Sequence, residues 1–412
     1  MTSRLLAPLV LAVLVGLSSP AAASEPNRGG PTPADNLGQR VAAALATSGA
    51  RTVAAAVDVD GLGVVLRREA DHQLPPASVQ KAFVGYAALR ALPAGTRLRT
   101  EVATTGVANP DGKLWASLWL VAGGDPYLTS AGLRALARSV RATGVREVVG
   151  SVYLDDTRYD AAREPSGWRD DFMPDESGPL SALAVDRNAR RTDSGYLADP
   201  AFPAAVQFRA DLRAEGVVVR GTVKRLARPA AATTIAERTS GPIEAVVRRV
   251  MKESDNFASE LLLKEVGYVV GGRGTSAGGI AAVRSVLGQE AVPFGAGSDG
   301  SGLSRYDRQS PNHQLALLGA AAASPLSAAF KATLPIACRD GTLKTRMCGT
   351  VAEGRVLAKT GTLTGVRVLS GYTTTASGRA AWFAFTLTGV TDGTKARTAL
   401  DRAAIILAGA PE

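Results

Sequence analysis

Histidine and cysteine are almost missing from this sequence. Its 412 residues include two histidines and two cysteines. Histidine is the side chain that most often exchanges a proton near neutral pH, so its scarcity argues against a histidine-based catalytic triad. Neither His72 nor His313 stands in a recognisable triad context. No zinc-protease helix motif or Walker loop is present, and we expect neither a metal ion nor a cofactor.

Charged residues are also few, at 20%, against a hydrophobic fraction of 46%. This balance excludes disorder over most of the chain. The formal net charge is +10, but the basic residues are scattered and no aromatic side chains are interleaved with them, which argues against a nucleic-acid partner. The positive charge fits either the anionic polymers of a cell wall or a generally solvated surface. Because one core rarely exceeds roughly 250–300 residues, we expect two or more folded units.

Long apolar runs are absent except at the start of the chain. Arg4 precedes an apolar stretch over residues 5–17, and Ala21-Ala22-Ala23 follows as a small-residue cleavage site. This pattern predicts a signal peptide over residues 1–23. A membrane anchor, the alternative, needs about 20 apolar residues, and proline and glycine interrupt this run. We expect export to the periplasm, the cell wall or the medium, without a transmembrane anchor.

The two cysteines, Cys338 and Cys348, bracket a short loop. In an oxidising compartment a disulfide between them is the favoured interpretation. Two free buried thiols remain the alternative, because the sequence alone does not prove a pairing.

The order of the predicted elements indicates a domain interrupted by an insert. A leader rich in Pro and Gly covers residues 24–35. Periodicity and turn residues predict the elements that follow: a helix over 37–47, strands over 52–59 and 63–68, a helix over 78–90, β-rich stretches over 99–105, 114–121, 145–154 and 217–223 with a helix over 130–142, helices from 242 to about 334, strands over 356–359, 366–374 and 381–388, and a helix over 395–407. We therefore predict one sheet closed by both ends of the chain, in a domain of residues 36–93 and 239–412, with an inserted β-rich domain over 94–238.

Three short strings carry the chemistry: Ser78-Val79-Gln80-Lys81, Ser254-Asp255-Asn256 and Lys359-Thr360-Gly361. The first places Ser78 and Lys81 three residues apart on one helix face. A serine hydroxyl is a poor nucleophile until a base removes its proton, and without a suitable histidine that base has to be a lysine. Burial and a nearby cation such as Lys359 lower a lysine pKa. The alternative is a helix-capping serine beside a solvated lysine.

The second string precedes a helix predicted over residues 257–266. In a serine-lysine site, Ser254 is suited to pass a proton between Lys81 and the leaving amine, and Asn256 to hold the substrate amide. A simple capping serine is again the alternative.

The third string ends a predicted strand. There Lys359 supplies positive charge, Gly361 lets the substrate backbone approach, and Thr360 and Thr362 are suited to bind a terminal carboxylate. The backbone N–H groups of Ser78 and Thr362 are candidate oxyanion donors. A solvent-exposed Lys-Thr-Gly turn is the alternative, but the order and context of all three strings favour a catalytic site.

With these residues the chain resembles the low-molecular-mass class C penicillin-binding proteins, which are exported D-alanyl-D-alanine carboxypeptidase/endopeptidases of bacterial cell walls. The resemblance runs from about Asn36 to the end of the chain. Further strings carry it: Pro76-Ala77-Ser78, Leu120-Val121-Ala122-Gly123-Gly124-Asp125-Pro126, Ser181-Ala182-Leu183, Asp186-Arg187-Asn188, Asp299-Gly300-Ser301-Gly302-Leu303-Ser304-Arg305, Asp340-Gly341-Thr342-Leu343 and Ser370-Gly371-Tyr372.

The resemblance implies an α/β (α+β) fold of the serine β-lactamase and penicillin-binding transpeptidase type, with an antiparallel sheet flanked by helices and a helical subdomain. It also implies peptidoglycan stem peptides ending in D-Ala-D-Ala as substrates and β-lactam antibiotics as covalent inhibitors. Ser78 would be the acylated nucleophile and Lys81 its base. The remaining roles fall on the residues of the other two strings: Ser254 and Asn256 as relay and amide holder, and Lys359, Thr360 and Thr362 as carboxylate binders.

In relatives that cut diaminopimelate-containing stems, an acidic residue after a Gly-Trp and an arginine grip the free end of that side chain. The resemblance assigns these roles to Asp171 (or Asp170), which follows Gly167-Trp168, and to Arg305. The spacing between Ser78 and Ser254 is shorter than is typical of the family, so we expect a second, nested insert to be missing or reduced.

Two other functions compete with a D-Ala-D-Ala peptidase. One is a penicillin-binding sensor that is acylated and hardly turns over, for which no catalytic position would need to be lost. The other is a β-lactamase or esterase of the same fold. Class A β-lactamases deacylate with a glutamate in a Glu-x-x-Leu-Asn string, and this sequence contains none.

Overall fold

The computed structural model describes residues 32–189, 191–192 and 195–411. The predicted signal peptide and residues 24–31 of the predicted leader lie outside these residues. The first helix, α1 (Pro33–Ala46), begins four residues earlier than its apolar pattern predicts. The cause is a capping box: the Thr32 hydroxyl accepts a hydrogen bond from the Asp35 backbone at 3.2 Å, and the Asp35 carboxylate accepts one from the Thr32 backbone at 3.0 Å.

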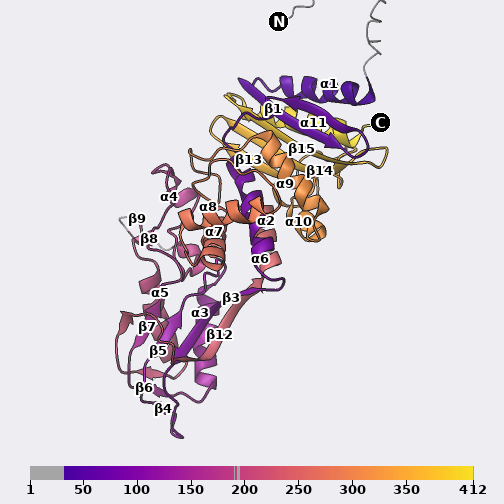
Figure 1. Cartoon of the computed structure of the whole chain (residues 1–412). Coiled ribbons are helices and arrows are strands. Elements are labelled where there is room, and N and C mark those ends of the chain that lie inside the picture. The colour runs from indigo at the N-terminus through magenta and orange to yellow at the C-terminus, as the bar shows by residue number, and fades with distance from the viewer. Residues whose placement is uncertain (1–31, 190, 193–194, 412) are drawn as a thin grey trace, which may run out of the picture.

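The sheet predicted to join the two ends of the chain is confirmed. Its strand order is β13-β14-β15-β1-β2, and every neighbouring pair is antiparallel. The strands are β1 (Thr52–Val59), β2 (Gly63–Arg68), β13 (Leu357–Leu363), β14 (Val366–Thr374) and β15 (Ala380–Thr388). Helices α1 and α11 (Gly393–Ala408) cover one face and share a hydrophobic core with it, whereas α9 (Pro311–Ala323) packs on β1 and β15 (Figure 1).

A group of helices lies next to this sheet, between it and the β-rich part of the molecule (Figure 1). Besides α9 it contains α2 (Gln80–Ala91), α6 (Ile243–Glu253), α7 (Asn256–Gly271), α8 (Ser276–Gly288) and α10 (Ser327–Thr333). Helix α2 runs through the centre of the group, and residues 80–89 are all buried. A helix that is buried all round presents no solvent face, so a polar side chain at its start is buried as well.

The chain between α2 and α6 forms separate sheets. The larger one has the order β11-β7-β5-β3-β12, and a three-stranded one has the order β10-β6-β4. The elements are β3 (Arg97–Thr104), β4 (Lys113–Leu114), β5 (Leu118–Val121), α3 (Ser130–Ala142), β6 (Glu147–Val148), β7 (Val152–Asp155), α4 (Phe172–Asp175), β8 (Arg191–Thr192), β9 (Gly195–Tyr196), α5 (Ala201–Ala214), β10 (Val218–Val219), β11 (Val223–Arg225) and β12 (Thr233–Pro242). Phe257 and Leu261 of α7 belong to the hydrophobic core of this part. The domain limits at residues 94 and 238 stay a prediction.

Three of the β-rich stretches predicted in this part are confirmed, each as a pair of short strands. The stretches over 114–121, 145–154 and 217–223 each break into two short strands, one in each sheet. The breaks lie against one another: the Gly150 backbone donates to Ala116 O at 3.1 Å, and the Gly221 backbone donates to Gly150 O at 2.9 Å. A Cβ at Gly150 would approach Ala116 O to 2.6 Å, so only glycine allows this close crossing. Hydrophobic pattern alone does not reveal such a bend, because both halves keep strand-like side chains.

In the part of the chain that the structure describes, we find no helix with the length and apolarity needed to cross a bilayer.

Candidate active site

The first predicted string folds as a tight turn that leads into α2. Ser78 lies in a 3₁₀ turn over Ala77–Val79, and α2 starts at Gln80. Ala77 has a φ of 48°, in the left-handed region that non-glycine residues rarely adopt. The Lys81 side chain is fully buried, and its Nζ lies 2.9 Å from Ser78 Oγ. The predicted pairing of the two side chains is therefore present.

The hydrogen bonds of Lys81 Nζ define how this amine can act. Besides Ser78 Oγ, it contacts Asn256 Oδ1 at 2.7 Å and Ser301 O at 2.6 Å. Both carbonyl oxygens can only accept a hydrogen bond, whereas a hydroxyl can also donate one. In the neutral amine, its two N–H bonds therefore go to the carbonyl oxygens and the lone pair is directed at the Ser78 hydroxyl. This is the arrangement that a general base requires.

Burial lowers the pKa of both lysines of the site. It lowers the pKa of the Lys81 ammonium to about 8, while the carboxylates of Asp299 and Glu260 oppose the shift. Burial, and after it the charge of Lys81, holds the pKa of Lys359 well below its usual value. With a pKa of about 8, roughly a tenth of Lys81 is neutral at pH 7. The site can thus supply an unprotonated amine without histidine.

The second string lies at the junction of two helices. Ser254 ends α6 with a φ of 56°, and the Asp255 carboxylate caps α7 by accepting from the Ala258 backbone at 3.0 Å. Asp255, rather than Ser254, is therefore the cap. The Ser254 hydroxyl is free for another contact, and it accepts a hydrogen bond from Lys359 Nζ at 2.8 Å.

The third string lies on β13, an edge strand of the sheet. Lys359 is fully buried and also donates to Thr360 O at 3.0 Å. A Cβ at Gly361 would lie 2.9 Å from Pro76 O and 3.1 Å from the Cβ of Ala77. A side chain at this position would therefore press on the turn that carries the nucleophile.

The predicted disulfide between Cys338 and Cys348 is confirmed. The loop that it closes contributes a side chain to the site, since the Thr360 hydroxyl donates to Thr342 Oγ1 at 2.8 Å. Asp340, in the same loop, pairs with Lys252 of α6 at 2.5 Å. Sequence reasoning assigned no role to Thr342, although its string was noted.

A pocket of about 800 Å³ opens in front of these groups. Its wall consists of Pro75, Ser78, Arg169, Phe172, Glu176, Ser254, Asn256, Leu303, Arg305, Arg308, Thr342, Thr360, Thr362, Leu363, Thr364 and Val366. The predicted residues Arg305 and Thr362 are therefore part of it. Asp170 and Asp171 are exposed and do not line it, and Asp171 pairs with Arg169. The roles of Asp171 and Arg305 stay predictions.

Two glutamates that the sequence did not reveal hold the partners of Lys81. The Glu176 carboxylate accepts from Asn256 Nδ2 at 2.8 Å, which fixes the amide so that Oδ1 faces the lysine. The fully buried Glu260 accepts from the Gly300 backbone at 3.0 Å and from the Ser301 backbone at 2.7 Å. It thereby holds the loop whose Ser301 carbonyl faces Lys81.

These glutamates differ in how far the sequence could have revealed them. Glu260 follows Asn256 by four residues on α7, so helical spacing places both on one face. Glu176 follows the short α4 in an irregular segment, where no periodicity relates it to the catalytic strings. Burial and the charge of Asp299 raise the pKa of Glu260 to about 8.

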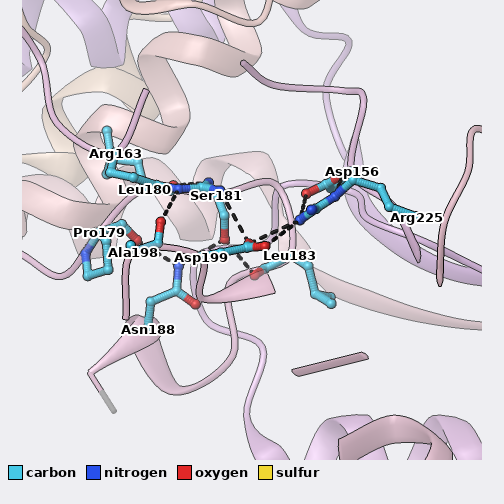
Figure 2. A network of polar contacts seen from close by, with 10 residues as sticks. All are labelled: Asp156, Arg163, Pro179, Leu180, Ser181, Leu183, Asn188, Ala198, Asp199 and Arg225. Atoms are coloured by element: carbon cyan, nitrogen blue, oxygen red, sulfur yellow. Dashed lines mark hydrogen bonds and ion pairs between the residues drawn. The ribbon is translucent and has the colours of Figure 1, made fainter. Parts of the chain in front are cut away.

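A polar network in the predicted insert holds in place a loop that contacts Asp255 of the second string. Figure 2 shows its two halves: Asn188 Nδ2 donates to Pro179 O at 2.7 Å and to Ser181 Oγ at 3.0 Å, and Arg225 pairs with Asp156 and Asp199. Arg163 joins them by donating to Leu180 O at 2.9 Å and to Asp199 Oδ1 at 3.3 Å.

The loop held by this network carries Arg187, which pairs with Asp255 through both carboxylate oxygens. Arg187 is flanked by Asp186 and Asn188, and all three have positive φ angles. The Ser-Ala-Leu and Asp-Arg-Asn strings therefore fix a contact between the insert and the catalytic motif.

Comparisons with known proteins agree with this geometry. A model of the D-Ala-D-Ala carboxypeptidase 3 (S13) family matches residues 36–195 and 189–409. The D-alanyl-D-alanine carboxypeptidase of Actinomadura sp. (strain R39) is 31% identical over 388 residues, which cover 74% of this chain and 72% of that protein. Carboxypeptidase DacB of Mycolicibacterium smegmatis is 30% identical over 404 residues, which cover 92% of this chain and 85% of that protein.

Among solved structures, penicillin binding protein 4 (dacB) from Haemophilus influenzae is similar with a TM-score of 0.79 and 23% sequence identity, over 88% of this chain and 97% of that one. This likeness confirms the predicted fold class. The match of the family model confirms the predicted resemblance and enzyme class. The chain belongs to the D-Ala-D-Ala carboxypeptidase 3 (S13) family of serine peptidases.

Proposed function

We propose that this carboxypeptidase works through an acyl-enzyme on Ser78, with Lys81 as the base. The observation that carries the proposal is the set of contacts around Lys81 Nζ, which direct its lone pair at Ser78 Oγ. Its substrates are peptidoglycan stem peptides that end in D-Ala-D-Ala, and cross-links that follow a D-Ala. Beyond the family assignment, the pocket residues support this choice, because hydroxyls and arginines suit a peptide with free carboxylates.

The reaction begins when Lys81 takes the Ser78 proton and the serine oxygen attacks the carbonyl carbon of the penultimate D-Ala. The backbone N–H groups of Ser78 and Thr362 stabilise the negative oxygen that forms. As the C–N bond breaks, Ser254 passes a proton to the departing amine and Lys81 gives up the proton that it took. Water then attacks the ester, and the acid product leaves with Ser78 restored.

The substrate carboxylate completes the electrostatics of the site. Thr360 and Thr362 bind it by their hydroxyls, beside Lys359. A carboxylate next to Lys359 favours the ammonium form of that lysine, because an opposite charge raises a lysine pKa. Substrate binding therefore favours a positive charge on Lys359, which burial disfavours in the free enzyme. Asn256 holds the amide of the acyl part, and β-lactams acylate Ser78 as analogues of the D-Ala-D-Ala end.

The enzyme acts outside the cytoplasm. The predicted signal peptide, the disulfide and a substrate found only in the cell wall support this location. N-terminal sequencing of protein recovered from culture should give Ser24 as the first residue. Retention of residues 1–23 on a membrane-bound product would contradict cleavage.

Purified mature protein tests the activity directly. It should release D-alanine from a bisacetylated Lys-D-Ala-D-Ala peptide, open cross-linked muropeptides, and keep a long-lived penicilloyl group on Ser78. Labelling of Ser78 without either peptidase activity would instead identify a penicillin sensor. Rapid hydrolysis of penicillin would identify a β-lactamase.

A further inference from the structure

A second groove, of about 370 Å³, lies where β13 meets α11. Arg346, Arg367 and Arg397 line it together with Gly361 and Thr362 of the catalytic strand and the first turn of α11. Thr362 also lines the catalytic pocket. The groove therefore shares Thr362 with the place where the substrate's terminal carboxylate is proposed to bind.

The groove carries an excess of positive charge. In the part of the chain that the structure describes, no acidic residue lines it. Arg346 pairs with Asp401, but among the described residues the Arg367 side chain donates only to backbone oxygens, Leu363 O at 3.0 Å and Val366 O at 2.8 Å. The exposed side chain of Arg397 has no hydrogen bond or ion pair within the described ranges 32–189, 191–192 and 195–411. Two guanidinium charges are thus left without a carboxylate, and guanidinium groups bind carboxylates in a two-pronged geometry.

We propose that this groove binds carboxylates of the second stem peptide in a cross-linked substrate. The inference rests on the proposed function, and it concerns the group that leaves. In a simple carboxypeptidase substrate that group is one D-alanine, which ends at the carboxylate beside Thr362. In a cross-link the leaving amine belongs to a whole second stem, and its chain has to continue beyond Thr362. Thr362 also lines the arginine groove.

A charge reversal on α11 tests the groove without touching the catalytic residues. Arg397→Glu changes an exposed arginine that lines the groove, and Arg402→Glu changes an exposed arginine on the same helix that does not. Each variant is assayed on a cross-linked muropeptide dimer with free carboxylates, on the same dimer with its second-stem carboxylates amidated, and on the bisacetylated Lys-D-Ala-D-Ala monomer.

Arg397→Glu should lower kcat/KM for the free-carboxylate dimer about tenfold, the scale of a lost charge-assisted contact. It should leave the amidated dimer and the monomer within about twofold of wild type, and Arg402→Glu should behave as wild type on all three. Added salt should reduce the advantage of the wild type on the free-carboxylate dimer.

Several outcomes would overturn the proposal. An equal loss on monomer and dimer would mean that Arg397 acts on the catalytic strand itself. Unchanged kinetics together with Arg397-dependent binding of poly(glycerol phosphate) would assign the groove to a phosphate-bearing wall polymer. If wild type releases D-alanine but leaves dimers intact, the subsite is wrong and the carboxypeptidase stands. If wild type cleaves neither substrate, the proposed function falls as well.

Discussion

The proposed catalytic groups lie on or next to regular helices and strands, whereas the pocket wall that faces them comes largely from irregular chain. Ser78 lies in the turn before α2, Lys81 on α2, Ser254 at the junction of α6 with α7, and Lys359 on β13, and both lysines are fully buried. The facing wall, with Arg169, Phe172 and Glu176, comes from irregular chain around the four-residue helix α4 of the insert (Figure 1). Buried, regular elements fix the distances that proton transfer needs, whereas irregular exposed chain is free to vary with the substrate.

The largest expected effect falls on the buried side of this comparison. Ser78→Ala removes the only atom that can carry the acyl group in the proposed reaction, so covalent penicillin labelling and D-alanine release should both disappear. Mass spectrometry of penicillin-treated protein measures the first, and a D-alanine assay the second. A penicilloyl adduct on the Ser78→Ala protein would move the nucleophile elsewhere.

Removal of the base should cost less than removal of the nucleophile. Lys81→Met keeps the length of the buried side chain but has no amine, and acylation by penicillin should slow about 10²–10⁴-fold, the usual worth of general-base catalysis. Stopped-flow or quenched labelling gives the rate constant, with circular dichroism as a check that the protein folds. Acylation at the normal rate would show that a different base operates.

The same lysine predicts the pH dependence. Because only neutral Lys81 accepts the Ser78 proton, and its pKa is about 8, acylation should rise about tenfold per pH unit between pH 6 and 7 and level off above pH 8. The rate rises with pH because the base has to be neutral, and burial, which disfavours the ammonium form, moves the midpoint down to about pH 8. A rate that falls over this range would mean that the protonated lysine is the active species.

A smaller effect is expected from Glu176, in the pocket wall that the insert contributes. It can be measured separately from the titration of Lys81. Glu176→Ala removes the shorter of two hydrogen bonds that hold Asn256 Nδ2 and leaves the 3.2 Å bond to the backbone carbonyl of residue 176, so acylation above pH 9, where Lys81 is neutral, should fall about tenfold at most. Glu176→Gln keeps an acceptor for Asn256 Nδ2 and should retain the wild-type rate at that pH. Glu164→Ala, at an exposed position of the same insert, is the matched control. Faster acylation by Glu176→Ala would mean that the carboxylate competes with substrate for Asn256.

The sequence could reveal features of the regular, buried elements more readily than those of the irregular insert. Ser78 and Lys81 were predictable because helical spacing relates them, and the end sheet because its strands alternate in a regular way. Glu176 was not, since no periodicity connects α4 with α7. The breaks in the strands of the insert were missed because the bend depends on three backbones crossing at Gly150, a tertiary contact without a local signal.

The smallest expected effect concerns the two residues assigned only by resemblance. Arg305 lines the pocket, whereas Asp171 is exposed and paired with Arg169. Arg305→Ala should therefore lower kcat/KM for a diaminopimelate stem about tenfold and leave the bisacetylated Lys-D-Ala-D-Ala substrate nearly unchanged. Asp171→Asn should change kcat/KM for the diaminopimelate stem by about fivefold at most, because an exposed ion pair contributes about 1 kcal/mol or less. Measurement of kcat/KM for both variants on both substrates tests these two expectations. The opposite outcome is a loss of kcat/KM with Asp171→Asn as large as that with Arg305→Ala. That result would mean that the α4 segment closes on bound substrate and brings Asp171 into the pocket. The insert would then be a moving part of the site and not a fixed wall.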